Sequence, residues 1–253
     1  VAPIFAFVGS RNRKILAATH GWTSQNLTIS ATILALLSLF LPPALTAQTP
    51  APQLVRFTVF SARPIADVAF APRAKTPPQK VAFYPTARSP RYEYRGAMPL
   101  RFVDATTGAV VAEASIPPEI RDPLLLFAPI EGAPAAGGLR FRISVLDDSA
   151  ARHGPGGLAI INFSGLALTG TVNQETVTLR AGLNPTLMVG RSAKLTLRTS
   201  FKNRTYQSYA DTVPLARNER ALLILFPPFY QGSLEVQARL LVDTPSGAGA
   251  PKR

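Results

Sequence analysis

The chain has 253 residues, 27 of them Lys or Arg and 14 Asp or Glu, so its formal net charge is +13. Hydrophobic residues make up 47% of the sequence, which is enough to bury one or two cores and excludes a wholly disordered chain. The absence of Cys excludes disulfides, Cys-ligated zinc and thiol nucleophiles, and the presence of only two His argues against most metal and His-dependent chemistry.

Residues 1–47 have the pattern of an export signal. Three basic residues, Arg11, Arg13 and Lys14, precede the 13-residue apolar run Ile29–Leu41, and a Pro pair is then followed by residues 44–47, which end in small residues. This order is typical of a secretory signal. Because a membrane-spanning helix needs ~20 apolar residues, we expect a cleaved signal helix, with an uncleaved anchor or a buried helix as alternatives. The protein is then periplasmic or extracellular, and this segment is its only expected membrane contact.

The rest of the chain predicts an all-β fold. Its apolar runs are short, rich in Val, Ile, Leu, Phe and Thr, and separated by Pro, Gly, Asn and Asp. No stretch has a convincing helical period. The expected strands of the first half are 55–61, 65–70, 81–84, 92–94, 100–103, 110–114, 121–129 and 139–149. Those of the second half are 158–164, 168–172, 177–179, 186–189, 194–198, 206–213, 220–228 and 234–244.

The two halves match in three places, which predicts an internal duplication. VRFTVFS at 55–61 matches LAIINFS at 158–164, RDPLLLFAP at 121–129 matches RALLILFPP at 220–228, and both halves close on Asp followed by a hydroxyl residue. Seven or eight strands per half favour two tandem immunoglobulin-like β-sandwich domains after the signal helix. The predicted organisation is signal 1–47, linker 48–53, domain 54–148, Gly/Pro-rich linker 149–157, domain 158–244 and disordered tail 245–253.

Two kinds of strand pattern predict burial. The continuous apolar runs at 124–127 and 222–226 indicate strands that are central in a sheet or covered on both faces. The alternating segment 140–146 places Phe141, Ile143 and Val145 inward, and residues 194–199 do the same with Leu195 and Leu197.

We expect no catalytic residue, cofactor or metal. His153 is the only His outside the signal, and its neighbours Asp147 and Asp148 supply too few ligands for a metal, so an exposed loop position is the favoured interpretation. No nucleotide-binding glycine motif is present, and specific nucleic-acid recognition is not expected. A carboxylate-dependent hydrolase stays an alternative, although the scattered acids have no spacing signature.

A group of cations interleaved with aromatics is the main candidate site. Its members are Arg88, Arg91, Arg95 and Arg101, with Tyr92 and Tyr94 between them. Such a patch can bind a polyanion such as an acidic polysaccharide. The simpler alternative is outward arginines on a strand with half-buried tyrosines. The chain has a second basic group, which comprises Arg198, Lys202, Arg204, Arg217 and Arg220. This group strengthens the polyanion hypothesis only if it lies on the same face as the first.

The pair Phe229-Tyr230 follows two prolines and is predicted to lie in a loop, where aromatic rings can stack on sugars. Possible stacking residues are therefore Tyr92, Tyr94, Phe229 and Tyr230. This is the basis of a carbohydrate-binding alternative.

The order of segments resembles that of uncharacterised exported bacterial proteins with tandem β-sandwich-like repeats. The residues that carry the likeness are VRFTVFS, RYEYRGAMPLRF, DPLLLFAP, ISVLDDS and IINFSG. These motifs are structural, so the resemblance implies a fold and no activity. We therefore expect a non-enzymatic binding or structural module of the cell envelope, whose partner is an envelope protein or an acidic polysaccharide.

Overall fold

Every regular element that the structure describes is a β-strand. The computed structural model describes residues 52–132 and 138–244, and it places seventeen strands there, which confirms the all-β prediction. The predicted signal segment 1–47, most of the predicted linker 48–53 and the predicted tail 245–253 lie outside the described residues.

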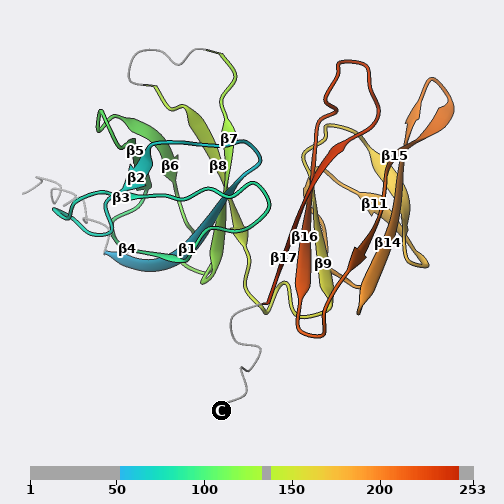
Figure 1. Cartoon of the computed structure of the whole chain (residues 1–253), viewed down its shortest axis with the longest axis horizontal. Coiled ribbons are helices and arrows are strands. Elements are labelled where there is room, and N and C mark those ends of the chain that lie inside the picture. The colour runs from blue at the N-terminus through green and yellow to red at the C-terminus, as the bar shows by residue number, and fades with distance from the viewer. Residues whose placement is uncertain (1–51, 133–137, 245–253) are drawn as a thin grey trace, which may run out of the picture. The chain divides into compact units, whose positions relative to one another are not determined.

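The first half forms two four-stranded sheets (Figure 1). Their strand orders are β4-β1-β7-β8 and β3-β2-β5-β6. Strands β1 and β7 run parallel, and all other neighbours are antiparallel. The bounds are β1 Gln53–Ser61, β2 Val68–Phe70, β3 Gln79–Lys80, β4 Tyr92–Gly96, β5 Leu100–Asp104, β6 Val110–Ala114, β7 Pro123–Pro129 and β8 Phe141–Asp147.

The second half also forms two sheets, with strand orders β12-β9-β16-β17 and β11-β10-β14-β15, and β13 pairs with β9 as well. Strands β9 and β16 run parallel, as β1 and β7 do, and the remaining pairs are antiparallel. The bounds are β9 Gly157–Asn162, β10 Leu168–Val172, β11 Glu175–Leu179, β12 Gly182–Leu183, β13 Leu187–Met188, β14 Ser192–Phe201, β15 Arg204–Pro214, β16 Arg220–Phe226 and β17 Gln237–Asp243.

Each half buries its own core between its two sheets. In the first half four phenylalanines, Phe57, Phe70, Phe102 and Phe127, meet at centroid distances of 5.0–6.0 Å. The second core is built mainly from aliphatic side chains, including the predicted inward residues Leu195 and Leu197. Sheets that pack face to face in this way are β-sandwich-like.

A third core joins the two halves. Strand β7 sends Leu125 and Phe127 into the first sandwich and Leu124 and Leu126 into the third core. Strand β16 divides its side chains in the same way. The members of the third core are Phe60, Leu124, Leu126, Leu146, Ala159, Ile161, Leu222, Ile224 and Leu241. Both strands are therefore covered on two faces, which confirms the burial predicted from their continuous apolar runs.

The segment between β8 and β9 is packed against the second half, and the exposed loop position predicted for His153 is wrong. Only 4% of His153 is exposed. The backbone N–H of Gly156 donates to the carbonyl of Glu219 at 2.7 Å, and the Gly156 carbonyl accepts from Val189 at 2.9 Å. The Gly/Pro-rich composition suggested a flexible, exposed linker. Backbone hydrogen bonds to the second half instead hold this segment in a fixed position.

Candidate binding surfaces

The predicted basic cluster does not form one open patch. Arg91 precedes β4 and forms an ion pair with Asp122 at 2.9 Å, whereas Arg101 lies on β5 of the other sheet and pairs with Glu113 at 3.0 Å. Arg95 lies on β4 and is exposed. Three of the four predicted arginines, Arg88 included, thus have a carboxylate partner.

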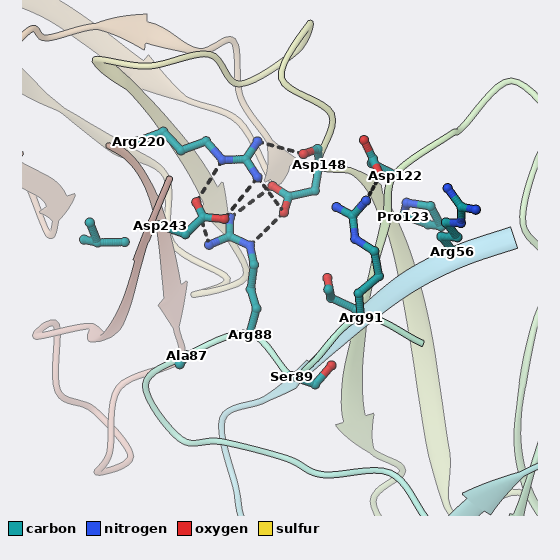
Figure 2. A pocket seen from close by; sticks show the side chains of 12 residues that line it. Arg56, Ala87, Arg88, Ser89, Arg91, Asp122, Pro123, Asp148, Arg220 and Asp243 are labelled. Carbon is teal, nitrogen blue, oxygen red and sulfur yellow. Dashed lines mark hydrogen bonds and ion pairs between the residues drawn. The ribbon is translucent and has the colours of Figure 1, made fainter. Parts of the chain in front are cut away.

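The side chain of Arg88 is largely buried, which contradicts its assignment to a surface patch. Its side chain is 9% exposed and reaches Asp148 through two hydrogen bonds, from Nε at 2.7 Å and from Nη2 at 3.0 Å (Figure 2). Its Nη1 lies 3.2 Å from Asp243 Oδ1, as an ion pair without hydrogen-bond alignment. A buried arginine needs such partners because desolvation of a charge is costly.

Arg220 completes a four-residue network of two arginines and two aspartates. All five of its N–H donors have acceptors: Nε and Nη2 bind Asp243, Nη2 also binds Asp148, and Nη1 binds the carbonyls of Asp148 and His153. Burial lowers the pKa of Arg220, but the hydrogen bond to Asp243 and the charge of Asp148 outweigh it, so the pKa is raised overall. Arg220 is therefore not part of an exposed second basic group.

This network connects distant parts of the sequence. Arg88 comes from the loop between β3 and β4, Asp148 from the segment after β8, Arg220 from β16 and Asp243 from the end of β17. Sequence reasoning missed it as a unit. The available signal was the Arg that opens the buried run at 220–228 and the Asp that closes each half.

The network borders a cavity of about 310 Å³. Its wall also includes Arg56, Thr58, Ser89 and the pair Arg91–Asp122 (Figure 2). Each carboxylate in this wall, on Asp122, Asp148 or Asp243, faces an arginine. Because these carboxylates are already engaged by arginines, the arrangement suits cohesion between the halves better than catalysis.

His153 lies beside the network, and its hydrogen bonds define the tautomer that carries the proton on Nδ1. The Thr186 hydroxyl donates to the carbonyl of Arg152 at 3.0 Å, so the contact of 2.7 Å between His153 Nδ1 and Thr186 Oγ1 has the imidazole as donor. Nε2 is buried and has no partner among the described residues. Burial lowers the pKa of His153, and the charge of Asp148 raises it in part.

Acidification is expected to destabilise the fold through His153. The unfolded chain takes up a proton near pH 6.5, whereas the folded protein does so only at lower pH, so stability falls as the pH drops below about 6.5. Urea unfolding at about pH 7.5 and about pH 5 measures this loss. His153→Asn keeps a donor toward Thr186 and is expected to show a smaller loss. An equal loss in both proteins would remove His153 as the cause.

The predicted stacking tyrosines are largely engaged within the first half. Tyr92 is 6% exposed and packs against Phe57 and Phe70 in the first core, with its hydroxyl accepting from the N–H of Ala82. Tyr94 is half-buried and donates to the carbonyl of Ala97 at 2.6 Å. Burial raises the pKa of Tyr94, while the charge of Arg101 lowers it in part.

Phe229 and Tyr230 lie in the loop between β16 and β17 and are 74% and 72% exposed. Their rings meet edge to face at 5.0 Å, with an angle of 73° between the planes. Two large exposed aromatics at one loop are unusual because burial of each would be favourable. This pair is the strongest candidate contact site among the predicted residues.

Among residues 52–132 and 138–244, no group of three or more His, Asp or Glu has the arrangement to hold a metal ion. The same residues contain no helix of the length and hydropathy needed to cross a bilayer. No protein-family model and no curated protein matches this chain.

Proposed function

We propose that this chain is an exported, non-enzymatic β-sandwich protein that acts as a binding or structural module of the cell envelope. Export is supported by the basic and apolar pattern of residues 1–47. The binding role is supported by one observation above all, the exposure of Phe229 and Tyr230 on a loop that two prolines precede. Aromatic residues at a surface loop are a common basis of recognition.

The proposal includes two immunoglobulin-like units that arose by duplication. The strand orders of the two pairs of sheets correspond, and each half contains one parallel pair, β1 with β7 and β9 with β16. The matched sequence segments fall on these same strands at offsets of 103 and 99 residues. The proposed units are 54–148 and 158–244, joined by 149–157.

The double variant Phe229→Ser/Tyr230→Ser is expected to lose most of the binding to isolated cell envelopes, because it removes the exposed apolar surface without touching a core. The protein as purified from a host that exports it is mixed with envelopes and sedimented. We expect at least about a tenfold loss of affinity.

Met188→Ser is the matched control, since Met188 is 72% exposed in the same half but at the other end of β9. The proposal is overturned if the double variant and this control bind as the wild type does. Fractionation of the host and N-terminal sequencing of the purified protein test export separately.

A polyanion- or carbohydrate-binding module is the second candidate. It is favoured by the net charge of +13 and by the exposed basic residues Lys202 and Arg204 at the tip of the β14–β15 hairpin. Retention on heparin over a salt series tests it. Elution together with a neutral protein at low salt would argue against this alternative.

A further inference from the structure

Three loops lie at one end of the second half: the β9–β10 loop, the tip of the β14–β15 hairpin and the β16–β17 loop. Strand β16 runs parallel to β9, so both strands end there. The end of β14 joins them, because the hydroxyl of Thr199 donates to the carbonyl of Ala167 in the loop after β9. The loop between β16 and β17 meets β15 through the bond from Val236 N–H to the Ser208 carbonyl. Figure 1 shows the β14–β15 hairpin and the β16–β17 loop projecting at the same end.

Exposed aromatic side chains gather on these loops. Phe229 and Tyr230 project from the β16–β17 loop, and Phe201 lies at the tip of the β14–β15 hairpin. Phe163 follows β9 and has its ring 6.4 Å from that of Phe226. None of these exposed rings belongs to one of the three cores.

The same end carries positive charge. Lys202 and Arg204 occupy the hairpin tip, and Arg198 is exposed on β14 below it. The Lys202 ammonium lies 5.4 Å from the Phe201 ring centroid, so a cation and an aromatic ring share the tip. In the β16–β17 loop, residues 227–236, Glu235 is the one acidic residue. The balance at this end therefore favours an anionic partner.

The geometry of the rings decides between a glycan and a bilayer. A sugar chain stacks on rings that offer a flat platform, but Phe229 and Tyr230 are inclined to each other by 73°. Insertion into the interfacial region of a bilayer has no such requirement, and aromatic side chains are enriched at that depth. Lys and Arg beside them attract anionic head groups.

We propose that this end of the second half binds the surface of an anionic lipid bilayer, which is a membrane contact beyond the one expected of residues 1–47. Phe229 and Tyr230 enter the interfacial region, and Lys202 and Arg204 contact the head groups. This inference rests on the proposed role as an envelope binding module, because export is what brings the chain to such a surface.

A single Trp at the loop tests the contact locally. Trp22 is the only Trp of the chain, so a full-length protein with Trp22→Phe and Phe229→Trp reports on position 229 alone. Vesicles with equal parts of phosphatidylglycerol and phosphatidylcholine are expected to shift its emission to shorter wavelength. A matched protein with Trp22→Phe and Met188→Trp is expected to show no shift. Because Trp22→Phe leaves residues 1–47 without Trp, that segment adds no indole emission to either measurement.

The contribution of the basic residues at the hairpin tip is tested in the protein that carries Trp22→Phe and Phe229→Trp. Lys202→Gln/Arg204→Gln is expected to weaken binding to the mixed vesicles about 30-fold, and pure phosphatidylcholine is expected to bind weakly in all variants. The inference is overturned if the indole introduced by Phe229→Trp shows no emission change with anionic vesicles, or an equal change with pure phosphatidylcholine. If envelope sedimentation still depends on Phe229 and Tyr230 in that case, the proposed function stands and the partner is a protein or glycan. If sedimentation is also independent of them, both proposals fail.

Discussion

Replacing Asp148 with Asn is expected to lower the free energy of unfolding by about 3–5 kcal/mol. Asp148 is 6% exposed and accepts from both Arg88 and Arg220, whose side chains are 9% and 5% exposed. Asn fills the same space but removes the negative charge, so two buried guanidinium groups share the single carboxylate of Asp243. Urea unfolding of the full chain measures the loss.

Asp122→Asn is the matched control for this experiment. Asp122 makes the same kind of pair with Arg91 at 2.9 Å, but the two side chains are 30% and 43% exposed. An exposed pair contributes at most about 1 kcal/mol, and salt weakens it further. A loss in Asp148→Asn that is no larger than that of Asp122→Asn would show that the network does not hold the two halves together.

Truncation of Ile224 to Ala is expected to cost about 2–5 kcal/mol, because Ile224 is fully buried in the third core. Its neighbours in that core include Phe60 and Leu126 of the first half. The cavity left by the missing atoms therefore weakens the contact between the halves as well as β16. Thermal or urea unfolding gives the size of the effect.

Hydrogen exchange distinguishes this result from a loss confined to the second half. In Ile224→Ala, amides of β7 are expected to lose protection together with those of β16, since both strands border the third core. Leu223→Ala, whose side chain lies in the core of the second half alone, is the control. A cost below about 1 kcal/mol for Ile224→Ala would mean that the side chain is exposed and the third core absent.

Strand positions were accessible from the sequence because apolar alternation and turn residues act locally. The predicted strands 110–114 and 168–172 coincide with β6 and β10, and the predicted strand 177–179 lies within β11, which pairs with β10. Continuous apolar runs at β7 and β16 indicated burial on two faces. The same runs did not predict what covers the second face of β7 and β16. Each half taken alone leaves that face exposed, and only the packing of the two halves against each other buries it.

The candidate site was predicted only in part. The loop position predicted for Phe229 and Tyr230 is confirmed, because the two prolines before them interrupt the strand pattern. Arg88 and Arg91 are close in sequence and identical in type, yet one is buried and the other half-exposed. The difference depends on Asp148 and Asp243, which lie 60 and 155 residues farther along the chain than Arg88.

The amino-acid sequence by itself determined the all-β class, the positions of most strands and the exposed aromatic loop. These properties follow from backbone propensity and from periodicity over a few residues. Tertiary structure alone decided that the two halves share a core, that Arg88 and Arg220 are buried against common aspartates, and that His153 is enclosed. Each of these depends on desolvation by residues from remote segments, and desolvation is a property of the packed molecule that no local pattern encodes.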